Sequence, residues 1–182
     1  STPFDHDSIN MLSELRLQIY KISSGDITNL PYLKHIGSLS KQVILSTGMS
    51  TLEEVGDALT VLINAGTSKE NITVLHANTM YPTPMEDVNL NAMLTIQKEF
   101  GIAVGYSDHT LGIEVDIAAV VMGASIIEKH FTLDRSDGGV DSAFSMEPCD
   151  FKMLASESYN AWLSLGRVFI GPTENEKKPV KF

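Results

Sequence analysis

The chain has 182 residues, of which 43% are hydrophobic and 20% are charged, ordinary values for a globular domain with one buried core. A net charge of −10 argues against nucleic acid or an anionic membrane surface as a partner, because both would repel it. The single cysteine cannot form an internal disulfide, and no apolar run reaches membrane-spanning length, so we expect a cytoplasmic protein.

Short β-rich runs recur along the chain, and a stretch with helical periodicity follows each of them. They are almost continuously apolar, as is typical of parallel strands covered on both faces. The expected strands are IYKISS (19–24), QVILSTG (42–48), ITVLHAN (72–78), IAVGYSD (102–108) and SIIEKHF (125–131). The opening STPF reads as the end of a further strand. Ser50 and Glu53, three residues apart, predict a capping box at the start of one helix.

The alternation of strand and helix predicts βαβ units and a parallel sheet. Polar residues follow the C-terminal end of every expected strand, which is where a TIM barrel builds its active site. A complete barrel takes about 250 residues. We therefore expect a partial TIM (β/α)8 barrel that lacks its first strands. No Gly-rich dinucleotide fingerprint or P-loop follows the first expected strand, which disfavours those nucleotide-binding folds.

Two histidines end neighbouring expected strands, His109 in GYSDHTLG and His130 in IIEKHF. Because adjacent strands lie about 4.8 Å apart, the two imidazoles could share one divalent metal, with water or substrate completing the coordination. The alternative is that each histidine is a hydrogen-bonded packing residue. His6 and His35 are expected at the surface, and His76 is expected to be a buried, hydrogen-bonded structural residue.

A set of hydroxyl and ammonium side chains also falls at the strand ends, where a barrel would bring it together. Such donors suit a phosphate or a carboxylate, although a single serine after a strand is more often a helix cap. The set comprises Lys21, Ser24, Ser46, Thr79 and Ser107. Tyr81 in the rigid YPTP loop could reach a substrate or could simply pack. Asp141 lies in a Gly- and Asp-rich loop and either binds a sugar or is solvated.

Six segments resemble, in the same order, the bacterial sialic acid synthases, a family that includes N-acetylneuraminate, legionaminate and pseudaminate synthases. The segments are KISSGDITNLP, ILSTGMSTLEEV, LHANTMYPTPMEDVNL, GYSDHTLGIEV, GASIIEKHFTLDR and SMEP. The resemblance spans nearly the whole chain, and it implies a TIM-barrel domain. The first and third segments are more similar to the legionaminate and neuraminate members than to the pseudaminate members.

The resemblance implies a condensation of phosphoenolpyruvate with an N-acetylmannosamine-type sugar, giving a nonulosonic acid and phosphate. It implies a divalent metal, Mn²⁺ or Mg²⁺, that polarises the sugar aldehyde. By the same resemblance His109 and His130 are metal ligands and act in catalysis with Glu128, while Asp108 and Thr110 support and cap the motif. Phosphoenolpyruvate-binding positions are matched by Lys21, Ser24, Ser46, Thr79, Ser107 and Thr2. Sugar-binding positions are matched by Tyr81, Asp141 and Asp26.

Some positions depart from the pattern of the family. Thr79 falls where some members carry Asn, a role that Asn78 could take, and Asp26 falls where some members have Glu. Residues 1–171 are expected to form the C-terminal two-thirds of the barrel, and 172–182 a linker toward an antifreeze-like domain. In the family that domain reaches over the partner subunit in a homodimer. In the family, the first strands of the barrel carry another lysine and an acidic residue of the site. We expect this chain to lack those strands and therefore to be nearly inactive alone.

Two further functions remain open on the same residues. The first is another metal-dependent TIM-barrel aldolase that uses phosphoenolpyruvate or pyruvate. If it is a pyruvate aldolase of the Schiff-base type, Lys21 is the candidate lysine. Borohydride would then trap the adduct of that lysine with pyruvate. The second is a non-catalytic module that binds a sugar phosphate, whose affinity should survive removal of the metal.

Overall fold

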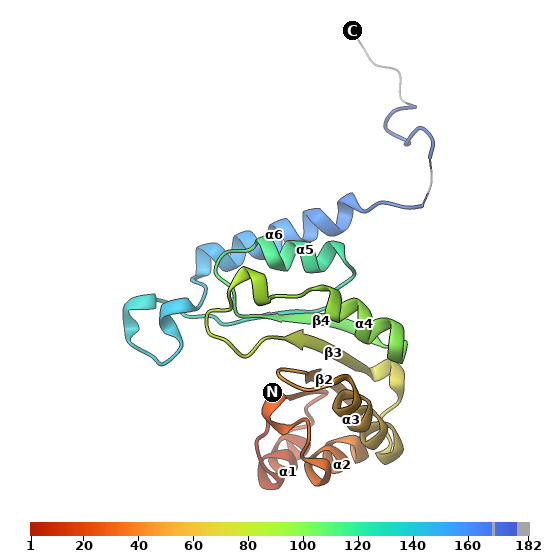
Figure 1. The fold of residues 1–182 in the computed structure, drawn as a ribbon, viewed down its shortest axis with the longest axis vertical. Coiled ribbons are helices and arrows are strands. Elements are labelled where there is room, and N and C mark those ends of the chain that lie inside the picture. Colours follow the sequence, from red (N-terminus) through yellow and green to blue (C-terminus); the bar gives the residue numbers. More distant parts are fainter. Residues whose placement is uncertain (169, 178–182) are drawn as a thin grey trace.

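The computed structural model describes residues 1–168 and 170–177 of the chain. Five parallel strands form one sheet in the order β1-β2-β3-β4-β5, which curls like part of a barrel wall (Figure 1). The strands are β1 (Ile19–Ile22), β2 (Gln42–Ser46), β3 (Ile72–Ala77), β4 (Ala103–Asp108) and β5 (Ile127–Lys129). The predicted α/β class and all five predicted strands are confirmed, each within a few residues of its expected bounds.

Helices follow the strands and pack on the outer side of the curled sheet (Figure 1). The α-helices are α1 (His6–Glu14), α2 (Leu30–Ser38), α3 (Leu52–Ala65), α4 (Asn91–Phe100), α5 (Glu114–Val121) and α6 (Pro148–Ser164). Short 3-10 helices are η1 (Ser24–Asp26), η2 (Lys69–Asn71), η3 (Met85–Asp87), η4 (Arg135–Asp137) and η5 (Ser142–Phe144). Within the described residues, no helix is both long enough and apolar enough to cross a membrane.

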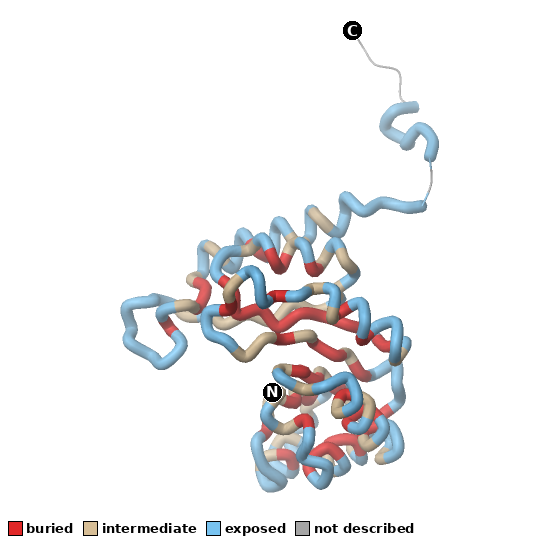
Figure 2. The backbone as a smooth tube through the Cα atoms, in the orientation of Figure 1, coloured by how far each residue is buried: buried red, intermediate tan, exposed pale blue. Residues whose placement is uncertain are grey.

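The core lies between the sheet and these helices, and Figure 2 shows buried residues along the strands and on the facing sides of the helices. Tyr20 and Ile22 of β1 alternate with partly exposed neighbours, so they point to the helix side. They belong to one buried cluster with Leu33 of α2 and Leu62 of α3. Burial of each large apolar side chain stabilises the fold by about 1.5–3 kcal/mol. This cluster therefore fixes which face of the sheet packs against the helices.

The start of α3 differs from the prediction by one residue. Thr51 and Glu54 form the capping box, since the Thr51 amide donates to Glu54 Oε2 at 2.7 Å and the Glu54 amide donates to Thr51 Oγ1 at 3.2 Å. The predicted box of Ser50 and Glu53 is wrong, because the Ser50 amide instead closes a turn onto the Thr47 carbonyl. That turn keeps Ser50 ahead of the helix.

The expected strand at STPF is not assigned as a strand, although its first residue pairs with β1. The Lys21 amide donates to the Ser1 carbonyl at 2.8 Å, and the Ser1 amino group donates to the Ile19 carbonyl at 3.4 Å. Ser1 therefore occupies the edge of β1 much as a neighbouring strand would.

Candidate active site

A cavity of about 120 Å³ opens at the C-terminal ends of the strands. Nine of the twelve predicted site residues line it: Lys21, Ser24, Ser46, Thr79, Tyr81, Ser107, His109, Glu128 and His130. They come from all five strands or from the loops that directly follow them. The strand ends therefore converge as a barrel requires.

The curl of the sheet is visible in one contact across this cavity. Lys21 Nζ on β1 lies 3.0 Å from Glu128 Oε1 on β5, although these are the two outer strands of the sheet. Four steps of about 4.8 Å would separate the same strands by roughly 19 Å in a flat sheet. Ser107 Oγ also donates to Glu128 Oε1, at 2.8 Å. One carboxylate oxygen is therefore held by a cation and a hydroxyl.

The two predicted histidines lie next to each other, with ring centroids 5.3 Å apart and the rings edge to face. His109 Nδ1 is 2.5 Å from the Asn78 carbonyl oxygen, which can only accept, so Nδ1 carries the hydrogen. Burial lowers the pKa of His109, which favours the neutral ring. Its Nε2 then holds the lone pair that a metal or an acceptor site needs.

His130 is oriented by a carboxylate in a similar way. Its Nδ1 lies 3.4 Å from Oδ2 of Asp141. Asp141 was predicted to contact the sugar, but it does not line the cavity. A carboxylate beside Nδ1 leaves Nε2 as the nitrogen available to a ligand, an arrangement common around metal-binding histidines. No group of three or more His, Cys, Asp and Glu side chains in the described part of the chain could hold a metal. A metal here would therefore need water or substrate oxygens as further ligands.

Two aromatic rings cover the histidine pair. The Tyr81 and His109 rings are tilted by 33° with centroids 4.1 Å apart, and the Phe144 ring centroid lies 5.3 Å from that of His130. The Tyr81 and Phe144 rings are themselves 5.5 Å apart. These contacts support the prediction that the loop at Tyr81 reaches the site. Phe144 was not predicted, because nothing in an irregular loop indicates which residue folds back.

The hydroxyl side chains that were predicted to bind a phosphate or a carboxylate line the same cavity. Ser46 Oγ is buried and has no hydrogen-bond partner among the described residues, which is unusual for a buried hydroxyl. Ser24 approaches from η1, beside Gly48, which has a φ of 53°. A Cβ on Gly48 would come within 2.5 Å of the Ser24 Cβ. The glycine thus lets the two loops close around the cavity.

Three predicted residues do not line the cavity, and of these Asp141 contacts His130 as described above. Thr2 and Asp26 do not line the cavity, and Asp26 instead accepts a hydrogen bond from Ser23 at 2.9 Å. Asn78, the alternative to Thr79, also lines the cavity, and its side-chain amide donates to the Asp87 carbonyl and accepts from the Met80 amide. His76 is hydrogen-bonded to the Val88 carbonyl at 2.9 Å as predicted, but it is only partly buried and lines a neighbouring hollow. His6 and His35 pair with each other near the surface, a contact that was not expected.

A larger hollow of about 450 Å³ lies beside α3 and α4. Its lining contains one titratable side chain, His76, and is otherwise made of hydroxyl, amide and apolar groups. The smaller cavity contains Lys21, Glu128 and both histidines. Clustered charged and titratable groups are what acid–base and metal chemistry need, so the smaller cavity is the candidate active site.

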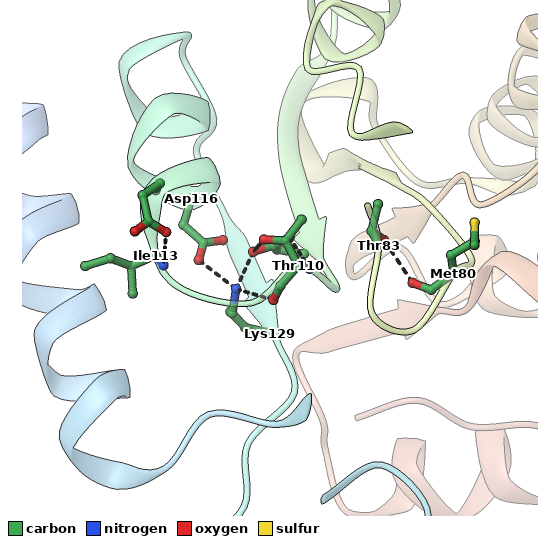
Figure 3. A network of polar contacts seen from close by, with 8 residues as sticks. Met80, Thr83, Thr110, Ile113, Asp116 and Lys129 are labelled. Atoms are coloured by element: carbon green, nitrogen blue, oxygen red, sulfur yellow. Dashed lines mark hydrogen bonds and ion pairs between the residues drawn. The ribbon is translucent and has the colours of Figure 1, made fainter. Parts of the chain in front are cut away.

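Behind the histidines, on the outer side of the sheet, lies a buried charged network (Figure 3). Lys129 Nζ contacts the Asp108 carboxylate, lies 3.2 Å from Asp116 Oδ2 of α5 and donates to the Thr110 carbonyl at 3.1 Å. The three charged side chains are at most 3% exposed. Lys129 and Asp116 were not predicted. The sequence feature that could have indicated them is a charged residue at a strand or helix position that should face an apolar layer.

The network generates a pH prediction for Asp116→Asn. Burial, and then the Asp108 charge, raise the pKa of Asp116 to about 7, so the folded protein retains a proton that the unfolded chain loses near pH 4. The stability of the wild type should therefore fall relative to the variant as pH rises from about 4 to about 7. Urea unfolding at pH 4.5 and pH 7.5 should show the difference growing by about 1–3 kcal/mol. A difference that is the same at both pH values would contradict this.

Comparison with known proteins identifies relatives of this chain in sequence and in fold. The sequence profile of the NeuB family matches residues 1–169. The chain is 48% identical to the N,N'-diacetyllegionaminic acid synthase of Campylobacter jejuni, over 99% of this chain and 54% of that protein. It is 47% identical to the synthase of the same name from Legionella pneumophila, over 97% of this chain and 50% of that protein.

A solved structure agrees with these relatives. The N-acetylneuraminic acid synthetase of Leptospira borgpetersenii, crystallised with citrate, superposes with a TM-score of 0.89 at 36% identity, over 97% of this chain and 61% of that chain. The chain spans about half the length of the curated relatives it matches. With a family match over nearly all of its residues and relatives close to half identical, this chain belongs to the NeuB family.

Proposed function

We propose that this chain forms about two-thirds of the TIM-barrel domain of a synthase that condenses phosphoenolpyruvate with an N-acylated mannosamine-type sugar. The products are a nonulosonic acid and phosphate. The observation that carries the proposal is the cavity itself, which places Lys21 and several hydroxyls beside Glu128 and two histidines with available Nε2 atoms. Together with the named relatives, this favours a legionaminic or neuraminic acid as product.

Two groups of side chains would bind the two reactants, phosphoenolpyruvate and the sugar. Lys21 and the hydroxyls of Ser24, Ser46 and Thr79 supply a positive charge and donors for the phosphate and carboxylate of phosphoenolpyruvate, whereas Ser107 donates its one hydroxyl proton to Glu128. Local positive charge is needed there because the chain as a whole carries −10. Tyr81 and Asp141, on the histidine side, would contact the sugar.

In the proposed reaction, carbon 3 of phosphoenolpyruvate forms a bond to the aldehyde carbon of the open-chain sugar. Water adds at carbon 2, and the C–O bond to phosphate breaks so that phosphate leaves. Glu128 lies inside the cavity and would accept the proton that this water loses, while the aldehyde oxygen takes up a proton and becomes a hydroxyl. Ser107 and Lys21 fix the orientation of the Glu128 carboxylate. Closing these reactants into one cavity also orients the two carbons that join.

His109 and His130 would hold a divalent metal through Nε2, with their Nδ1 atoms turned to Asn78 and Asp141. When bound, the metal would supply Lewis-acid polarisation of the sugar aldehyde. Neutral imidazoles are ligands that transition metals accept more readily than Mg²⁺ does, which favours Mn²⁺ of the two candidates.

The complete protein would be longer than this chain. Its relatives are about twice as long, and the curled five-stranded sheet would be closed by further strands into an eight-stranded barrel. We propose a homodimer in which residues 172–177 and the five that follow lead to a second domain; residues 178–182 lie outside the described part. On this account the isolated 182-residue chain has little or no activity.

The first test is phosphate release from phosphoenolpyruvate by the complete protein. Release should require both Mn²⁺ and a mannosamine-type sugar, and His109→Ala should lower it by at least about 100-fold because one of two protein ligands is lost. A folded wild-type protein that releases no phosphate with any such sugar would contradict the proposal. A lysine adduct trapped by borohydride and pyruvate would instead support a Schiff-base aldolase.

A second test concerns the unpaired hydroxyl of Ser46. If it donates to phosphoenolpyruvate, Ser46→Ala should raise the KM for phosphoenolpyruvate by about 10–100-fold, the value of a hydrogen bond to a charged group. The KM for the sugar should change little. Ser8→Ala, in α1 and away from the cavity, is the matched control. An unchanged KM for phosphoenolpyruvate in the Ser46 variant would remove Ser46 from the binding site.

A further inference from the structure

We propose that Lys129 is a positioning residue, which ties the backbone beside His109 to the backbone beside His130 from the outer face of the sheet. This inference rests on the proposed metal site, and it assigns a role to a lysine that does not line the cavity. Lys129 directly precedes His130, and its partner Asp108 directly precedes His109. The contact between them therefore links the two residues that carry the histidines.

The strand register explains why one pair can act on both histidines. Asp108 and Lys129 are direct partners in the β4–β5 ladder, as are Ser107 and Glu128. Side chains alternate along a strand, so Asp108 and Lys129 point outward where Ser107 and Glu128 point into the cavity. Holding the outward pair fixes the rotation of both strand ends. The residues that follow, His109 and His130, then both turn inward.

The loop after β4 is held by the same network. The Asp108 carboxylate accepts from the Thr110 amide at 2.8 Å and from Thr110 Oγ1 at 3.0 Å, which closes a tight turn around His109. Lys129 Nζ donates to the Thr110 carbonyl at 3.1 Å (Figure 3). His109 thus lies between two residues that are both bound to Lys129. Few movements of this turn are possible without breaking one of these contacts.

The burial of the network needs a reason beyond general stability. Lys129, Asp108 and Asp116 are almost completely buried, and burying such charges costs more than packing apolar residues of similar size. A layer between a strand and α5 would ordinarily be apolar, as it is at Tyr106, Val115 and Ala119. Charged partners give what apolar packing does not, which is a fixed direction for each strand end. Asp116 anchors the ammonium to α5.

The test uses Co²⁺ as the probe, in the complete protein, because its visible absorption reports ligand geometry without turnover. Lys129→Met keeps the length of the side chain and removes the charge, and Asp108→Asn keeps the shape of its partner. Each should weaken Co²⁺ binding by about 10–100-fold and shift the absorption bands. His109→Ala assigns the signal to this site. The Asp108 variant also serves if Lys129→Met fails to fold.

Leu62→Ala is the control for a purely structural role, because Leu62 is fully buried in α3 and belongs to a different part of the core. It should lower the melting temperature yet leave Co²⁺ affinity within about two-fold and the bands unmoved. Unchanged affinity in the Lys129 and Asp108 variants, or an equal loss in Leu62→Ala, would overturn the inference. So would a folded wild type that binds no Co²⁺. Wild type that binds Co²⁺ but forms no product would overturn the proposed function alone.

Discussion

The parallel register of β4 and β5 is the constraint on which the site depends. It places Ser107 opposite Glu128 and Asp108 opposite Lys129, and the two histidines come directly after these pairs. Because side chains alternate, one register produces a reactive inner layer and a charged outer layer at once. A slip of one residue would send Glu128 toward α5 and Lys129 into the cavity. Backbone hydrogen bonds alone would form equally well in the slipped register. The buried ion pair of Asp108 and Lys129 therefore stabilises the observed register over the slipped one.

The curl of the sheet adds the second condition for chemistry. It brings Lys21 from β1 within 3.0 Å of Glu128 on β5, so a cation, a carboxylate, hydroxyls and two imidazoles share one small space. In a protein of net charge −10, such a concentrated group of donors can hold an anionic reactant against the surrounding field. The Nδ1 contacts of His109 and His130 then decide which ring nitrogen faces that space.

Sequence patterns predicted the strands, the parallel sheet and nine of the cavity residues, because apolar runs and polar strand ends follow directly from the fold. They did not predict Phe144, whose approach to His130 depends on how a long loop folds. They did not predict Lys129, because a lysine is ordinarily expected at the surface, whereas here its side chain is buried beside Asp116 of α5. Asp26 and Thr2 lie outside the cavity lining, since matching a motif fixes order along the chain but not the direction of each side chain.

We propose that the two strand ends present the Nε2 atoms of His109 and His130 to one shared metal. The most direct measurement is anomalous diffraction from crystals of the complete protein grown with Mn²⁺ and phosphoenolpyruvate. We expect a single strong peak within about 2.3 Å of both Nε2 atoms, with phosphoenolpyruvate against Lys21 and Ser46. A peak bound through Nδ1, or a metal that leaves either histidine uncoordinated while phosphoenolpyruvate occupies the cavity, would contradict it.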